Sequence, residues 1–261
     1  MTEFADHLPL FCVLFFLAAT AHSSVGLGGG SSYTAIMALS GLSTALIPSI
    51  SLSLNLIATS IGAFHFIRHG HARWPLVLPF LVFSLPAAYL GGSLTLPRAI
   101  FYPLLLASLL LMAWQLLREA TPASDSPRQF TSRQQLFISL FIGAVLGFLA
   151  GAVGIGGGIY LVPLIILLGL SGEKEAAACG AIFIWLNSAA GLLARSQDLR
   201  PEVSELLPLA LAVILGSSLG SKLGASRLPV RSLQRILAGV LLLASLLLAH
   251  KTIKVLSLNS L

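Results

Sequence analysis

The sequence predicts an all-α polytopic membrane protein, built from two inverted repeats of about five hydrophobic segments each. Composition is the first reason: 56% of the 261 residues are hydrophobic, only 9% are charged, and the mean hydropathy is +0.94. An ordinary soluble domain carries about 25% charged residues, so this composition excludes a soluble enzyme and a nucleic-acid-binding domain. The net charge of +6 therefore indicates basic loops beside anionic lipid headgroups, with membrane lipids and not nucleic acid as partners.

Two glycine clusters are the second reason, because they divide the chain into halves. The clusters are Val25-Gly26-Leu27-Gly28-Gly29-Gly30 and Val153-Gly154-Ile155-Gly156-Gly157-Gly158, and they lie 128 residues apart. Four further dipeptides recur in the same order at offsets of 129 or 132 residues: Leu54-Asn55 and Leu186-Asn187, Leu78-Pro79 and Leu207-Pro208, Leu90-Gly91 and Leu219-Gly220, Leu96-Pro97 and Leu228-Pro229. Five coincidences in register predict an internal duplication.

Each half contains five apolar segments, all expected to be helical because only helices and closed barrels satisfy backbone groups in lipid. The segments lie near residues 8–25, 29–41, 45–67, 75–94 and 98–117, and near 135–153, 157–170, 176–194, 206–221 and 229–249. The first segment ends like a signal peptide, at Ala19-Thr20-Ala21, but no Lys or Arg precedes it and the repeat requires it as a helix. These segments predict a first transmembrane repeat at 1–118, a cytoplasmic linker at 119–134 and a second repeat at 135–261.

The distribution of Lys and Arg is the third reason, and it favours an external N-terminus. With five segments per half, ten basic residues fall on the inner side and five on the outer side, as the positive-inside rule requires. An arrangement with four crossings per half places nine basic residues on the inner side and six on the outer side, a weaker bias. Homologous halves with an odd number of crossings lie in opposite orientations, the plan of many secondary transporters. The inner residues are Arg68, Arg73, Arg118, Arg128, Arg133, Lys174, Lys222, Arg227, Arg231 and Arg235; the outer ones are Arg98, Arg195, Arg200, Lys251 and Lys254.

The second segment of the first half is too short for a simple crossing. Residues 29–41 make roughly 20 Å of helix at 1.5 Å per residue, whereas the hydrocarbon core is about 30 Å thick. The glycine-linked first two segments of each half are therefore either two tilted crossings or a re-entrant hairpin. The sequence does not choose between these two arrangements.

The charge pattern and the glycine clusters together favour an anion site. All nine carboxylates fall in tails or loops, whereas a cation transporter usually keeps an acidic residue within the membrane. Glycine clusters break helices, and the N–H groups at the start of the following helix, with the helix dipole behind them, bind anions. The alternative role of the clusters is close helix packing through small residues.

Hydroxyl and amide side chains complete the predicted substrate site. Ser31 and Ser32 follow the first cluster directly and either face a ligand or cap their own helix. Asn55 and Asn187 are the duplicated amides, either substrate ligands or clasps between helices. His22 lies four residues before the first cluster and either reaches the site, as a proton carrier, or packs between helices. The predicted substrate-binding residues are Gly28, Gly29, Gly30, Ser31, Ser32, Asn55, Gly156, Gly157, Gly158 and Asn187.

These features resemble the TauE/SafE family of sulfite exporters, also called the toluene sulfonate uptake permeases. The resemblance rests on the paired Gly-x-Gly-Gly-Gly segments, on Pro163 after the second and on the duplicated Asn residues, and it extends from about Leu8 to Leu248. The first half departs from it, with Ala35 where the family pattern often places Pro. The resemblance implies a secondary transporter of sulfite, a sulfonate or a related small sulfur anion in a bacterial inner membrane. It implies no catalytic residue, cofactor or metal.

Two other functions remain open at the level of sequence. A metal-cation permease would use the cluster His65, His69 and His71, and an intramembrane serine hydrolase would use Ser31 or Ser32 with His22 or His65. The sequence also leaves open which sulfur oxyanion is carried, in which direction and with which coupling ion, and whether the chain forms a homodimer.

Overall fold

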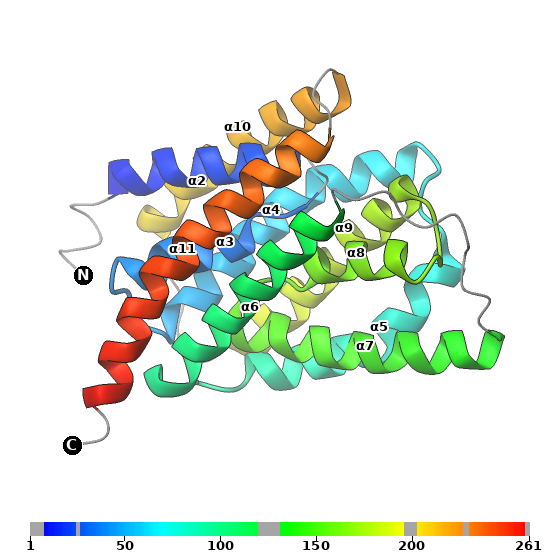
Figure 1. Ribbon diagram of the computed structural model, residues 1–261. Helices are drawn as coiled ribbons and strands as arrows, with labels where there is room; N and C mark the ends of the chain where they lie inside the picture. The colour runs from blue at the N-terminus through cyan, green and yellow to red at the C-terminus, as the bar shows by residue number, and fades with distance from the viewer. Residues whose placement is uncertain (1–7, 25–26, 120–130, 196–202, 227–229, 259–261) are drawn as a thin grey trace.

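The computed structural model describes residues 8–24, 27–119, 131–195, 203–226 and 230–258, and these ranges contain ten α-helices and no β-strand (Figure 1). Each helix corresponds to one of the ten predicted apolar segments. The helices are α2 (Leu8–Ser23), α3 (Gly30–Leu39), α4 (Leu46–Arg68), α5 (Trp74–Gly92), α6 (Arg98–Glu119), α7 (Ser132–Val153), α8 (Gly158–Leu167), α9 (Glu173–Arg195), α10 (Val203–Ser226) and α11 (Val230–Leu258).

Seven of these helices are long and apolar enough to cross a membrane, namely α4, α5, α6, α7, α9, α10 and α11. The predicted all-α polytopic membrane fold is therefore confirmed. Helix α2 has 16 residues, and α3 and α8 have 10 each. Ten residues make about 15 Å of helix, half the thickness of a hydrocarbon core. Each glycine cluster thus leads into a helix that begins within the protein.

Most helix boundaries lie within a few residues of the predicted ones, and contacts in the structure explain two of the differences. Helix α7 begins at Ser132 because Thr131 and Gln134 form a capping box, in which each side chain bonds the backbone N–H of the other. Helix α11 continues to Leu258, past the predicted end at residue 249. The predicted helix stops at residue 249 because hydropathy falls beyond it. In the structure Lys251, on this extension, donates hydrogen bonds from Nζ to the carbonyl oxygens of Ala38 (2.7 Å) and Leu39 (3.2 Å) at the end of α3.

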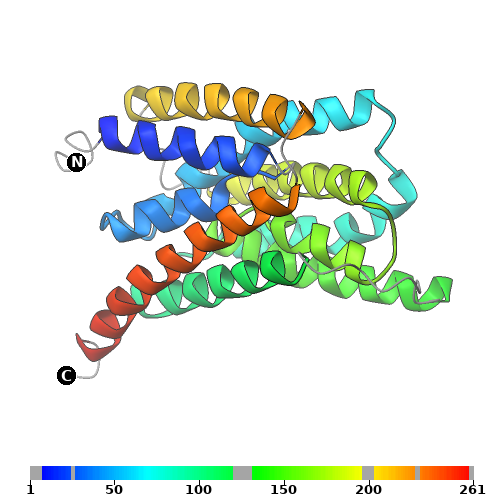
Figure 2. The same cartoon turned by 45° about the horizontal axis from the view of Figure 1, so that its top comes forward.

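Helices of the two halves pair with one another. The most extensive contacts join α5 to α7, α10 to α2, α11 to α6 and α4 to α9. In Figure 1, α2 and α10 lie side by side along the top and α5 and α7 along the bottom, and the rotated view of Figure 2 keeps both pairs together. The fourth helix of each half therefore packs against the first helix of the other half.

Glycines at every fourth position permit both of these contacts. A Cβ on Gly143, Gly147 or Gly151 of α7 would meet backbone carbonyl oxygens of α5, and a Cβ on Gly216 or Gly220 of α10 would meet those of α2. Residues four apart lie on one face of a helix, so each row forms a flat strip against which the neighbouring backbone packs. This is the small-residue packing common in membrane helices.

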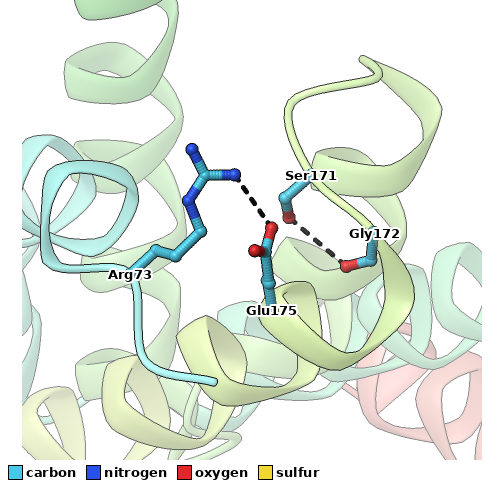
Figure 3. Close-up of polar contacts among 4 residues, drawn as sticks. All are labelled: Arg73, Ser171, Gly172 and Glu175. Carbon is cyan, nitrogen blue, oxygen red and sulfur yellow. Dashed lines mark hydrogen bonds and ion pairs between the residues drawn. The ribbon is translucent and has the colours of Figure 1, made fainter. Parts of the chain in front are cut away.

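An ion pair joins the halves at the end of the molecule where α4 ends and α9 begins. Arg73, in the α4–α5 loop, donates from Nη1 to Oε2 of Glu175 in the first turn of α9, at 2.9 Å (Figure 3). The backbone turn beside it is held by a bond from Ser171 Oγ to the Gly172 carbonyl oxygen. Both side chains of the pair are substantially exposed, so the pair contributes at most about 1 kcal/mol.

Candidate functional site

The two glycine clusters meet inside the molecule, where they enclose a small cavity. We name residues 27–30 the first glycine loop and residues 154–158 the second; Val25 and Gly26 lie outside the described residues. The cavity has a volume of about 10 Å³, which is room for one water molecule. It is lined by His22, Leu27, Gly28, Gly30, Ser31, Ile155, Ile159 and Ile184. Both halves of the chain therefore contribute to one site.

Each glycine loop leads into the N-terminus of a short helix. Gly29 is the N-cap of α3 and Gly157 is the N-cap of α8, and no side chain caps either helix. Ser31 and Ser32 therefore do not cap α3, one of the two roles considered for them. Because the first amides of a helix have no partner within it, the start of α3 presents N–H donors where the two loops converge. At the start of α8 the N–H groups of Gly158 and Tyr160 already donate to the carbonyl oxygens of Gly156 and Gly157.

Asn55, on α4, lies between the two glycine loops. Its side chain is fully buried, and neither Oδ1 nor Nδ2 has a hydrogen-bond partner within the described ranges. A Cβ on Gly28 would come within 2.8 Å of Asn55 Oδ1, one on Gly156 within 2.9 Å of Nδ2, and one on Gly30 would overlap the amide. Glycine is thus required at these positions because the Asn55 amide approaches the backbone so closely.

Asn187, the repeat counterpart of Asn55 on α9, is placed differently. It is also fully buried, but its Nδ2 donates to the Phe183 carbonyl oxygen of its own helix at 2.8 Å. Neither Asn187 nor Asn55 is among the residues that line the cavity, but Asn55 packs directly against Gly28, Gly30 and Gly156. The structure brings Asn55, and not Asn187, to the meeting point of the glycine loops.

His22 and Ser31 form a buried polar pair at the cavity. Nδ1 of His22 lies 2.9 Å from the Ala18 carbonyl oxygen, and Nε2 lies 3.2 Å from Ser31 Oγ. A carbonyl oxygen only accepts, so Nδ1 carries a hydrogen, and in the neutral ring Nε2 then accepts from the Ser31 hydroxyl. His22 is therefore part of the site. Ser32 is also buried, and its Oγ is unpartnered among the residues described.

Ser51 connects the two glycine loops and was not predicted as a site residue. Its Oγ lies 2.7 Å from the Gly154 carbonyl oxygen and 3.1 Å from that of Gly30, and it accepts a hydrogen bond from Thr34 Oγ1 at 3.0 Å. Ser51 lies four residues before Asn55 on the same helix face, but its bonds to both loops are visible only in the structure.

Ile184 supplies the apolar wall of the cavity and was likewise not predicted. A Cβ on Gly156 would lie 2.8 Å from its Cγ2, and one on Gly28 would lie 3.5 Å from the same atom. The side chain thus touches both loops. An isoleucine in an apolar helix gives no signal in the sequence that separates it from its neighbours.

The second glycine loop depends on left-handed backbone. Gly154, Gly156 and Gly157 have φ of +85°, +84° and +74°, a region that residues with a Cβ adopt only at a cost of roughly 1–2 kcal/mol. Gly158, the first residue of α8, has an ordinary helical backbone but packs against Ile184 and the backbone of Gly180. The three glycines of this loop that were predicted as site residues therefore serve a tight turn and close packing.

The histidine cluster has no visible metal geometry within the part of the chain that the structure describes. No group of three His, Cys, Asp or Glu side chains in it is placed to hold a metal ion. His69 is exposed and His71 is partly exposed, while the side chain of His65 lies outside the description. The metal-permease hypothesis for His65, His69 and His71 accordingly stays a prediction.

The fold is that of a multi-pass membrane protein, and the comparisons identify its class as a membrane transporter. The chain belongs to the TauE/SafE family: the family model "Sulfite exporter TauE/SafE" matches residues 11–248. It is 35% identical to the probable membrane transporter protein y4hK of Sinorhizobium fredii, over 89% of this chain and 94% of that protein. It is 28% identical to the probable membrane transporter protein YunE of Bacillus subtilis, over 94% and 98% of the two chains. No solved structure matches the chain.

Proposed function

We propose that this protein is a secondary transporter of a small sulfur oxyanion, sulfite or an organosulfonate, and that it works by alternating access in a bacterial inner membrane. The carrying observation is the Asn55 amide, fully buried between the two glycine loops with no partner among the described residues. A buried amide without partners costs free energy. A ligand that accepts from Nδ2 recovers part of that cost.

The groups around Asn55 suit an oxyanion. The first glycine loop and the start of α3 offer backbone N–H groups, and Ser32 offers an unpartnered hydroxyl. The Ser31 hydroxyl becomes available when it leaves His22 Nε2, and none of these donors carries a charge. Neutral dipoles bind an anion strongly in a dry site while leaving it free to dissociate. The family description names sulfite, a small oxyanion whose oxygens accept several hydrogen bonds.

The substrate-binding residues we propose are Gly28, Gly29, Gly30, Ser31, Ser32 and Asn55 of the first half, with Gly156, Gly157 and Gly158 forming the facing wall. Asn187 uses its Nδ2 within its own helix in this conformation. It joins the site only in a conformation in which that bond opens.

The size of the cavity supports alternating access. Its volume of about 10 Å³ holds one water molecule, whereas sulfite has four heavy atoms. Binding therefore requires the loops to separate, and Ile184, which packs against both, is the side chain that must withdraw. The reciprocal packing of α5 on α7 and α10 on α2 supports two inverted repeats that rock against each other around the site.

A transport screen with the purified protein tests this function. Proteoliposomes are loaded and assayed with sulfite, thiosulfate, sulfoacetate and sulfate, and in parallel with a divalent cation. We expect saturable flux of sulfite or a sulfonate, and none of the cation. Cation flux without anion flux would contradict the proposal and favour the metal permease of the histidine cluster.

A further inference from the structure

A second polar cavity lies at the opposite end of α4 from Arg68, where α5 and α9 end. Its volume is about 20 Å³, and it is lined by Ala45, Ser49, Gly92, Ser93, Thr95, Ala194 and Arg195. Ser49 precedes Asn55 by six residues, which is about 9 Å along α4. Ser93 and Thr95 are exposed, so the cavity lies at the protein surface, beside the helix that also carries Asn55.

Arg195 is the charged residue of this cavity. The sequence assigns it to an outer loop, but it is the last residue of α9 and only 8% exposed. Its Nη2 donates to the carbonyl oxygens of Gly151 (3.1 Å), Ala152 (3.2 Å) and Leu94 (3.3 Å). These bonds hold the guanidinium against the end of α7, directly before the second glycine loop.

Two donors of this cavity have no partner among the described residues. They are Nε of Arg195 and Oγ of Ser49, both buried. If Arg195 served only to cap the end of α7, the buried and unpaired Ser49 hydroxyl beside it would have no role. A guanidinium N–H and a hydroxyl at one cavity match the donor needs of an oxyanion.

We propose that Arg195 and Ser49 form a second binding site for a small oxyanion, separate from the glycine-loop site and on the path between it and the surface. The choice of a sulfur oxyanion rests on the proposed function, whereas the site itself rests on the cavity and its two donors. The anion accepts from Arg195 Nε and Ser49 Oγ while Nη2 keeps its bonds to the backbone. A volume of about 20 Å³ is also too small for sulfite, so the exposed side of the cavity, at Ser93 and Thr95, must open to admit it. The positive charge attracts anions to this end of the protein and passes them to the neutral donors beyond.

The rival arrangement is an internal ion pair. Asp198 and Glu202 follow Arg195 in the stretch 196–202 that lies outside the described residues. If one of their carboxylates occupies the cavity, no second anion binds. The two arrangements differ in the number of anions bound per chain.

The test is the stoichiometry of radiolabelled sulfite binding to the full-length protein in detergent, measured by equilibrium dialysis. We expect two sulfite ions per chain in the wild type. Ser49→Ala and Arg195→Lys should each weaken the second site about tenfold or more, since each removes a hydrogen-bond donor to a charged ligand. Lysine keeps the positive charge but has no Nε donor. Ser53→Ala is the matched control, because Ser53 Oγ only bonds the Ser49 carbonyl oxygen of its own helix.

The outcomes separate this proposal from the proposed function. One ion per chain, lost in Asn55→Ala but unchanged in Ser49→Ala and Arg195→Lys, overturns the second site and leaves the transporter hypothesis standing. One ion lost in Ser49→Ala but kept in Asn55→Ala supports the second site and contradicts the glycine-loop site. Absence of bound sulfite in the wild type overturns both.

Discussion

The two glycine loops have nearly the same sequence but use their glycines for different reasons. In the second loop Gly154, Gly156 and Gly157 have positive φ, so glycine is required by the backbone. In the first loop Gly28 and Gly30 do not have positive φ, and glycine is required because the Asn55 amide occupies the space of a Cβ. A duplicated motif has therefore specialised: the second copy forms a left-handed turn, whereas the first copy needs glycine for close approach to Asn55, which Gly156 of the second copy also approaches.

The side chains that accompany the two loops also differ, in polarity. The first loop is accompanied by His22, Ser31 and Ser32, whereas the second contributes Ile155 and Ile159 to the cavity. The site thus has a polar side from the first half and an apolar side from the second. Substitutions on the two sides should therefore differ in their effects on sulfite flux and on stability.

The largest expected effect is that of Gly30→Ala. A Cβ there overlaps the Asn55 amide and approaches the Ile155 carbonyl oxygen to 2.8 Å, so the loops must separate. We expect sulfite flux in proteoliposomes to fall to background. Gly62→Ala is the control, since nothing lies within 4 Å of a Cβ at Gly62 and alanine in a helix gains up to about 1 kcal/mol. Wild-type flux in Gly30→Ala would show that the loop contact is not required.

The pair Gly28→Ala and Gly156→Ala should separate the two uses of glycine. Both should lower the melting temperature in detergent, Gly156→Ala through backbone strain of roughly 1–2 kcal/mol. Adding Asn55→Ala removes the atom nearest to the new Cβ at Gly28 but cannot relieve a positive φ. We therefore expect a double-mutant cycle with Asn55→Ala to restore much of the melting temperature lost in Gly28→Ala and much less of that lost in Gly156→Ala. Equal recovery of the melting temperature in both variants would mean that the two loops require glycine for the same reason.

Ser51→Ala should have a smaller effect, because it removes the bonds between the loops without adding atoms. We expect a loss of about 1 kcal/mol in unfolding free energy and a partial loss of flux, read from thermal melting and transport of the same preparation. Ser53→Ala, which removes a bond within α4 alone, serves as its control. If both variants behave alike, Ser51 does not couple the loops.

The smallest expected effect is at the exposed ion pair of Arg73 with Glu175 (Figure 3). Glu175→Gln should change the unfolding free energy by at most about 1 kcal/mol, and that difference should shrink at high salt because exposed charges are screened. A large, salt-independent loss would show that this contact joins the two halves more strongly than its exposure indicates.

Much of the fold could be predicted because lipid imposes simple rules on sequence. Ten apolar segments predicted ten helices, and the duplicated glycines predicted that the two loops matter. Ser51 and Ile184 could not be predicted, since their importance comes from contacts across the two halves. The difference between Asn55 and Asn187 was also beyond the sequence, because a bond from Asn187 to its own helix depends on side-chain orientation. Arg195 was predicted in a loop, since a charge at a segment end gives no sign of burial.

The central claim is that Asn55 binds the transported anion, and sulfite flux through proteoliposomes of Asn55→Leu tests it most directly. Leucine has a similar volume and removes two polar atoms that have no partner in the described structure, so folding should be unimpaired or improved. We predict that Asn55→Leu melts at or above the wild-type temperature yet has no saturable sulfite flux, whereas Asn187→Leu retains measurable flux. Wild-type flux in a well-folded Asn55→Leu would contradict the account.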